Sequence, residues 1–189
     1  MPTDVDVVNQ ALMLVGNNSP PVTGVSPTFD TSTFGRAAAT LYPSAVAAVQ
    51  RWWGWDAARR IVTLSATGNT PPSGLFTQEY LYPTNGIQVW QLIPGTISDA
   101  YNPAPVNWSV GNNTVSAQQK KVIWTNLASA RAFYNNNPGP DVWDADFEQA
   151  VVFYLASQFA MGTAGKPSAA KEFMQAAMTL SKVAEERVD

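Results

Sequence analysis

The chain has no cysteine and no histidine among its 189 residues. These two absences exclude disulfide bonds, thiolate nucleophiles, Cys/His zinc sites and the Ser-His-Asp arrangement of hydrolases. Any catalysis would therefore have to use carboxylates. A chain without cysteine is also consistent with synthesis in a reducing compartment.

Charge is scarce as well. Charged residues make up 13% of the chain, and 11 basic residues stand against 14 acidic ones, for a net charge of −3. A protein that grips nucleic acid needs a basic stripe to displace counterions from phosphates, and this sequence contains none. Hydrophobic residues reach 46%, which excludes wholesale disorder. So few charges in so apolar a chain predict either a surface of polar, uncharged residues, which the abundant Asn, Thr, Ser and Gln favour, or a surface hidden against partners, which the seven tryptophans favour.

Long apolar runs are missing too. No run approaches the roughly 20 residues of a membrane-spanning helix. The acidic start, Met1 to Asp6, lacks the positive region of a signal peptide. We therefore expect no membrane contact, and the length of 189 residues suits one domain or one domain with an elaborated layer.

The first segment has a helical pattern. Thr3 or Asp4 can cap a helix that carries apolar residues at helical spacing and stops at Gly16. After a loop, a second helix is expected from Asp30 to Trp52. Pro43 falls inside this helix and predicts a kink or a break there.

The middle segment has strand-like sequence. Between residues 61 and 119 only Glu79 and Asp99 are charged. Short β-branched or aromatic runs bounded by turn residues predict strands at 61–64, 78–82, 87–93 and 121–124. Asn85-Gly86 is a tight-turn signal between two of them. The pattern indicates a small antiparallel sheet.

The last segment returns to helix. Acids from Asp141 to Asp146 favour a helix start, and the apolar residues that follow predict a helix from Trp143 to Met161 that is buried all round. Ser168 can cap a final helix that ends near Arg187. We therefore predict an α+β fold, in which helices from both ends form a bundle and a small antiparallel β-sheet domain is inserted between them. The expected segments are 1–56, 57–137 and 138–189, within one continuous structural unit.

Four carboxylates are the only candidates for catalysis: Asp141, Asp144, Asp146 and Glu148. Paired carboxylates can cleave glycosidic bonds, but helix capping explains acids at this position more simply. The cluster also lacks the spacing and the central glycine of a calcium loop. The glycines from Gly162 to Lys166 lie between two predicted helices rather than after a strand, which indicates an interhelical turn and not a phosphate loop. We predict no enzyme activity, no cofactor and no metal.

Three tryptophans stand within four residues at the end of the second helix: Trp52, Trp53 and Trp55. Such a cluster indicates a heavily packed corner, an exposed aromatic platform or a subunit interface. A platform for stacked bases would need a basic groove, which the sequence does not supply. These three residues are therefore candidates for subunit packing or for a hinge.

Several strings follow one another in a recognisable order. They are Val8-Asn9-Gln10-Ala11-Leu12 up to Val15-Gly16 and Pro20-Pro21-Val22; Tyr42, Trp53-Gly54-Trp55 and Ile61 to Leu64; Tyr80-Leu81-Tyr82-Pro83 and Ile87 to Leu92; and Tyr134 to Pro138 with Trp143 to Phe159. In this order they resemble the phage tail tubular protein A family, the head-to-tail adaptors. The resemblance covers nearly the whole chain. Pro43 and Asp56 depart from the family's pattern.

The resemblance implies a structural virion protein of the phage neck, synthesised in the host cytoplasm. It would form a homo-oligomeric ring, typically of twelve copies, between the portal protein and the downstream tail or nozzle protein. Genomic DNA would pass through the channel without specific binding, and no active site is implied. Two alternatives stay open: a carbohydrate-binding or depolymerising tail component, and a hexameric tail-completion or terminator protein.

Overall fold

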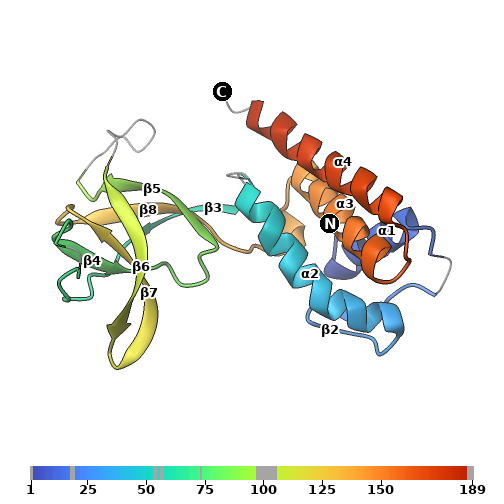
Figure 1. Ribbon diagram of the computed structural model, residues 1–189, viewed down its shortest axis with the longest axis horizontal. Coiled ribbons are helices and arrows are strands. Elements are labelled where there is room, and N and C mark those ends of the chain that lie inside the picture. The colour runs from blue at the N-terminus through green and yellow to red at the C-terminus, as the bar shows by residue number, and fades with distance from the viewer. Residues whose placement is uncertain are drawn as a thin grey trace. The chain divides into compact units, whose positions relative to one another are not determined.

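The computed structural model describes residues 2–17, 20–52, 55, 58–72, 74–96 and 106–186. The chain divides into two compact units, which we call the helical unit (1–58 with 137–189) and the β unit (59–136). The predicted α+β fold is confirmed, because helices from both ends of the chain form one unit and antiparallel strands lie between them in the sequence (Figure 1). We expected one continuous structural unit from the sequence, but the contacts between residues divide the chain into two units.

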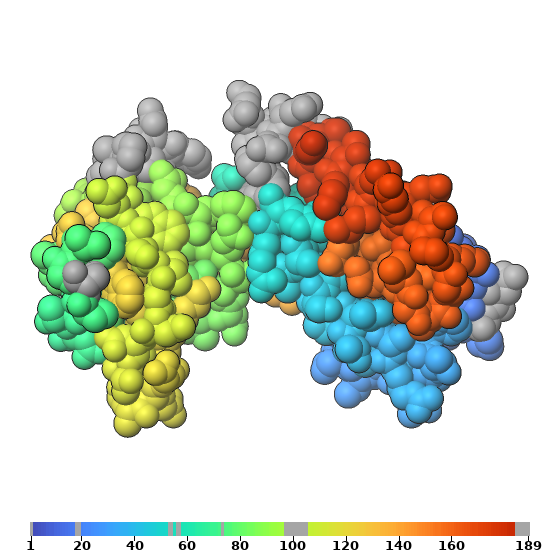
Figure 2. Space-filling model, viewed as in Figure 1, coloured from blue at the N-terminus to red at the C-terminus, as the bar shows by residue number. Residues whose placement is uncertain are grey.

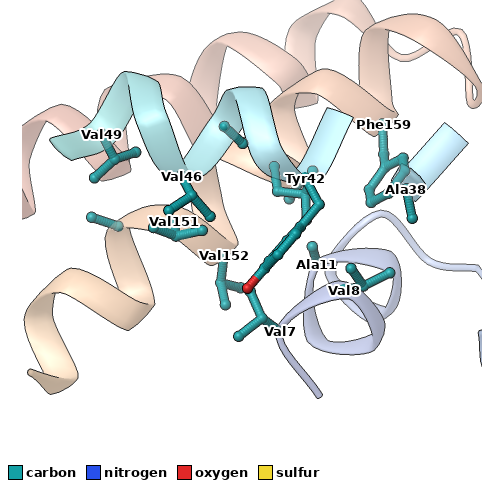
Figure 3. Close-up of a cluster of buried hydrophobic side chains, with 14 of the residues drawn as sticks. Val7, Val8, Ala11, Ala38, Tyr42, Val46, Val49, Val151, Val152 and Phe159 are labelled. Atoms are coloured by element: carbon teal, nitrogen blue, oxygen red, sulfur yellow. The ribbon is translucent and has the colours of Figure 1, made fainter. Parts of the chain in front are cut away.

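The helical unit is organised around α3. Its elements are α1 (Asp4–Leu14), β1 (Gly24–Val25), β2 (Thr28–Phe29), α2 (Thr33–Trp52), the 3₁₀ helix η2 (Pro140–Val142), α3 (Ala145–Gly162) and α4 (Pro167–Glu186). The helices α1, α2 and α4 all contact α3. Buried residues occur on every side of α3, as the apolar pattern predicts. Figure 3 shows part of the resulting core, with Val7 and Val8 of α1, Val46 of α2 and Val151 of α3.

α1 is bounded by the residues predicted for its ends. The Asp6 N–H donates to the Thr3 hydroxyl at 3.3 Å, and the Thr3 N–H donates to the Asp6 carboxylate at 2.8 Å, which is a capping box. At the other end Gly16 has a φ of 76°, and its N–H donates to the Met13 carbonyl at 2.9 Å. Glycine adopts this left-handed conformation without the penalty of a Cβ, so it ends the helix.

α2 differs from its prediction in two ways. It begins at Thr33 rather than Asp30, because the residues ahead of it serve as caps. The Ser32 hydroxyl accepts the Gly35 N–H at 2.9 Å, and the Asp30 carboxylate accepts the Ser32 N–H at 2.9 Å. The helix also continues through Pro43 without a break. Pro43 lies on the exposed side, where water can satisfy the carbonyl that lacks its usual donor.

The last two helices start at other residues than predicted. α3 begins at Ala145 rather than Trp143, because Trp143 closes η2 in an extended conformation. α4 begins at Pro167, whose fixed φ and missing N–H suit the first helical position. Ser168 therefore lies inside the first turn and is not the cap.

The β unit contains two three-stranded antiparallel sheets, in the orders β3-β8-β5 and β4-β7-β6 (Figure 1). The strands are β3 (Arg59–Thr63), β4 (Gln78–Leu81), β5 (Gln88–Pro94), β6 (Trp108–Val115), β7 (Gln118–Thr125) and β8 (Ala130–Asn135). Their shared core draws on both sheets and includes Leu64, Tyr80, Leu92, Ile123 and Ala132. An isolated bridge between Ala66 and Tyr80 connects the segment after β3 to β4.

The predicted turn at Asn85-Gly86 exists but does not make a hairpin. Asn85 has a φ of 61°, and the Gly86 N–H donates to the Pro83 carbonyl at 3.0 Å. The strands on either side of it pair elsewhere, β4 with β7 and β5 with β8. The tight hairpin joins β6 and β7 instead, through Ser116 and Ala117 with φ values of 52° and 62°. Neither residue is the Asn or Gly that signals such a turn in a sequence.

Tyr42 ties α2 to α1. Its side chain is 4% exposed, and its hydroxyl donates to Asp4 Oδ1 at 2.6 Å (Figure 3 labels Tyr42). Its ring packs edge-on against Phe29, with 6.0 Å between the ring centroids. Burial, together with the Asp4 carboxylate, raises the pKa of Tyr42 above its usual value. The hydroxyl therefore stays protonated and keeps donating at neutral pH.

The Tyr42→Phe substitution removes this hydrogen bond and leaves the ring packing in place. We expect it to lower the free energy of unfolding by about 1–2 kcal/mol, because the Asp4 carboxylate loses its donor but can be partly rehydrated. Urea unfolding followed by tryptophan fluorescence measures the change. Asp4→Asn is the matched control, since it keeps an acceptor and should be milder. Equal stability of Tyr42→Phe and the wild type would show that the bond contributes nothing net.

Candidate functional site

The tryptophan corner is mostly an internal feature of the helical unit. Trp55 is 3% exposed, and its indole N–H donates to the Val49 carbonyl at 3.0 Å. Its ring lies against Phe147 of α3, with 5.1 Å between centroids. The indole N–H thus has the partner that burial demands. Trp53 lies outside the described residues.

Further aromatic contacts extend this corner along α3. Trp143 packs edge-on against Phe147 at 4.8 Å and donates its indole N–H to the Pro138 carbonyl at 3.0 Å. Trp52 packs edge-on against Tyr154 at 5.1 Å and is half-buried. The geometry therefore joins the end of α2 to α3. Trp55 has little surface left for any other contact, whereas part of the Trp52 indole faces outward.

The four candidate carboxylates lie at the start of α3, as predicted, but only partly as caps. Asp144 is the N-cap residue, yet its side chain makes no capping hydrogen bond. Asp146 and Glu148 occupy the first turn, where a negative charge complements the helix dipole. Asp141 belongs to η2 and is exposed. In the described part of the chain, no group of three or more acidic side chains could hold a metal ion.

The Gly162–Lys166 segment is the interhelical turn that its position predicts. α3 ends at Gly162 and α4 begins at Pro167. Lys166 Nζ donates to the Val15 carbonyl at 2.8 Å. A cation at this place compensates the unsatisfied carbonyls and the negative end of the α1 dipole. The lysine thus closes α1, a role that its sequence context does not reveal.

A shallow pocket lies beside the start of α2. It is lined by Pro20, Pro21, Thr23, Asp30, Thr31, Ser32, Thr33 and Phe34. Its one carboxylate, Asp30, already accepts the N–H groups of Ser32 at 2.9 Å and of Thr23 at 2.7 Å. Hydrogen bonds from Ser32 and Thr23 lower the pKa of Asp30 to about 2. The carboxylate is therefore an anionic cap, committed to the backbone around it.

Glu79 is the polar group that sequence reasoning missed. It is 1% exposed in β4. Its Oε1 accepts hydrogen bonds from the Thr67 hydroxyl at 2.8 Å and from Asn69 Nδ2 at 3.1 Å. Its Oε2 accepts from Asn113 Nδ2 at 2.7 Å and from Trp124 Nε1 at 2.8 Å. No local signal exists for this site, because the four donors come from three separate parts of the sequence.

The network holds Glu79 as an anion without any cation among its hydrogen-bond partners. Burial raises the pKa of Glu79, but the four hydrogen bonds act in the opposite sense and leave its pKa below the usual value. Each oxygen has two donors, so neither has a free lone pair for a substrate proton. The carboxylate is suited to anchoring strands and loops rather than to acid–base catalysis.

Gly111 completes this arrangement. It lies in β6 one strand away from Trp124 in β7, and a Cβ on Gly111 would overlap the Trp124 ring. The absent side chain leaves room beside the Gly111 Cα for the indole, whose N–H donates to Glu79. This is the close approach for which glycine is needed inside a strand.

No protein-family model matches the chain, and no curated protein matches its sequence. Among the described residues, no helix is both long enough and apolar enough to cross a membrane. The functional assignment therefore depends on the residues themselves and on the order in which they occur.

Glu79 gives the β unit a defined pH dependence. Because its folded-state pKa lies below the ordinary value of 4.5, the stability it contributes is complete above that value and is lost as the pH falls through the folded-state pKa. We expect Glu79→Gln to lose about 1–3 kcal/mol at pH 7, since a glutamine amide nitrogen would face donors. Urea unfolding between pH 7 and about pH 3 should show the gap between the two proteins narrowing in acid. A gap that widens or stays constant would contradict the account.

A methyl group at position 111 should disturb the packing of Trp124 and lower the stability of the β unit. We expect Gly111→Ala to displace the Trp124 indole and to lower the unfolding free energy by about 1–3 kcal/mol. Thermal unfolding and the tryptophan emission maximum report the two effects. Gly162→Ala is the matched control, because nothing lies within 4 Å of its added Cβ, at the end of α3. Similar behaviour of both variants would disprove the close approach.

Proposed function

We propose that this chain is a structural virion protein, a head-to-tail adaptor subunit of a phage. Copies of it form a ring, of twelve subunits, between the portal protein and the lower tail. Genomic DNA passes through the central channel without specific binding. The protein acts by assembly and not by catalysis.

The observation that carries the proposal is that the strings that resemble those of the adaptor family contact one another. The Asn9 amide donates to the Val22 carbonyl at 3.0 Å, and the Val22 N–H donates to Asn9 Oδ1 at 2.8 Å. These two bonds join the opening helix string to the Pro-Pro-Val turn. Likewise, Trp55 of the string Trp53-Gly54-Trp55 packs on Phe147, which belongs to the string from Trp143 to Phe159. These contacts support the proposal, because they join the strings that carry the resemblance into one structural arrangement.

Exposed apolar side chains on the helical unit add support. Met13 is 73% exposed and Met161 is 62% exposed. Further exposed residues of this kind in the unit are Leu14, Val25, Val142, Met178 and Val183. A closed ring needs two different, complementary patches on each subunit. Apolar side chains of this size at the ends and outer faces of helices suit burial by neighbouring copies.

The distribution of charge also favours head-to-tail contacts between copies. The β unit contains five basic and two acidic residues, whereas the helical unit contains six basic and twelve acidic residues. One of the two acids of the β unit is the buried Glu79. A basic part of one copy and an acidic part of the next attract each other, and such complementarity fixes orientation. An acidic majority also suits a channel that must release DNA.

Electron-microscopy class averages of the purified full-length chain, alone and with the portal protein of the same phage, test the proposal. We expect a ring with twelvefold symmetry and a mass of twelve times 20.4 kDa, whether it forms alone or only on the portal. The ring should weaken as salt is raised from about 0.1 M to 1 M, since screening shortens the reach of the charges.

Other outcomes point to other functions. Sixfold symmetry would favour a tail-completion or terminator protein. A chain that stays monomeric with the portal and binds or hydrolyses glycans on an array would favour a carbohydrate-directed tail component. Either result would overturn the adaptor proposal.

A further inference from the structure

The outer edge of β6 carries unpaired backbone groups. The Lys121 carbonyl in β7 accepts the Tyr82 N–H at 3.1 Å, so the backbone of Lys121 faces β4. Asn112 lies opposite Lys121 and therefore has its own N–H and C=O turned away from β7. Because this orientation recurs at every second residue, the same holds for Trp108, Val110 and Thr114.

One end of this edge is closed by side chains. The Thr114 N–H donates to Asn113 Oδ1 at 2.8 Å, and the Thr114 carbonyl accepts from Asn69 Nδ2 at 3.2 Å. For Trp108, Val110 and Asn112, the outward groups have no partner in the part of the chain that the structure describes.

These three residues are also accessible. Val110 is 40% exposed, Asn112 is exposed and Trp108 is half-buried. In its sheet β6 is an outer strand, and Figure 2 shows the β6–β7 hairpin (yellow) at the surface of the β unit. The edge therefore presents donors and acceptors at alternate residues to whatever reaches it.

The outer edges of β3 and β5 are guarded and that of β4 is hydrogen-bonded to residues 65–67, and this contrast singles out β6. On β5 the Val89 N–H is taken by the Tyr82 hydroxyl at 2.9 Å, the pairing is interrupted by a bulge at Trp90, and the strand ends in Pro94, which has no N–H. β3 carries two arginines. Charges, bulges and prolines are the devices that keep edges from pairing with other chains. The sequence of β6, WSVGNNTV, contains none of them.

We infer that the β6 edge pairs with the β6 edge of a second copy of this chain. An antiparallel pairing about a two-fold axis at Val110 places Val110 opposite its own copy and Trp108 opposite Asn112 of the partner. Each outward N–H then meets an outward carbonyl, which gives about six hydrogen bonds. The two sheets merge into one continuous antiparallel sheet.

Three properties of the β6 edge favour a second copy of this chain as its binding partner. The unpaired residues are spaced evenly about Val110, so the edge is complementary to itself, as a two-fold contact requires. No charge lies in β6, so two copies of the strand do not repel each other. The side chains of Val110 and Trp108 point to the same side of the sheet and gain apolar neighbours from the partner.

This contact is separate from the proposed ring. A two-fold contact is complete after two copies, whereas a ring repeats a head-to-tail contact. The pairing of β6 therefore does not rest on the adaptor function, and it can join two subunits or two assemblies.

Val110→Pro tests the contact selectively. The Val110 N–H faces the open edge, so proline removes an edge donor without removing a bond to β7. Val110→Lys places like charges opposite each other across the two-fold axis. Ser109→Lys is the matched control, because it adds the same charge one residue away, on the other side of the sheet. Circular dichroism and the thermal midpoint confirm that each variant is folded.

The full-length protein is examined by analytical ultracentrifugation over a range of concentrations and by hydrogen exchange. We expect concentration-dependent association in pairs, giving a dimer of the free chain or a pair of rings where the ring has formed, with slowed exchange at the amides of Trp108, Val110 and Asn112 in the paired state. Val110→Lys should weaken dimerisation at least about tenfold, and so should Val110→Pro if it folds, while Ser109→Lys should not.

Two results would overturn the inference. One is a wild-type protein that shows no association at any concentration. The other is an assembly of any size whose mass is unchanged in Val110→Lys and whose three edge amides exchange as fast as in the monomer. If that unchanged assembly is a twelvefold ring, the adaptor proposal still holds and only the inference of β6 pairing fails.

Discussion

The stability of the helical unit depends on the burial of α3 by the other helices. This helix has buried residues on every side, so it is stable only when other helices enclose it. α1 and α2 come from the start of the chain and α4 from its end, so the core closes only when both ends meet. Bringing them together across the intervening β unit has an entropic cost that grows slowly with loop length. Aromatic contacts such as Trp55 on Phe147 offset that cost where the chain leaves the unit.

A second constraint operates in the β unit, where polar rather than apolar contacts join distant segments. Glu79 collects four donors from Thr67, Asn69, Asn113 and Trp124. A buried carboxylate is tolerable only when its lone pairs are satisfied, so losing one donor affects the positions of the others. The bare Cα of Gly111 is part of the same solution, since it makes room for the indole. The network thus determines how the β6–β7 hairpin lies on β4.

Local features were predictable, and features that depend on distant segments were not. The capping role of Thr3, the stop at Gly16 and the buried character of α3 follow from neighbours within a few residues, and the structure confirms them. The turn at Asn85-Gly86 was predicted, but the partners of its flanking strands are chosen by tertiary packing. The strands β6 and β8 were missed, and so was the Glu79 network. Polar residues such as Asn113 look like loop sequence until their hydrogen-bond partner is known.

The scarcity of charge links the two units to the assembly that we propose. In the β unit it leaves the edge of β6 without the lysines, prolines or bulges that normally prevent contact with other chains. In the helical unit it leaves large apolar side chains such as Met13 and Met161 on the surface. An isolated soluble monomer gains nothing from either feature, because both raise the risk of non-specific association. Both are useful when specific partners cover them, so the composition favours a subunit whose final state is an assembly.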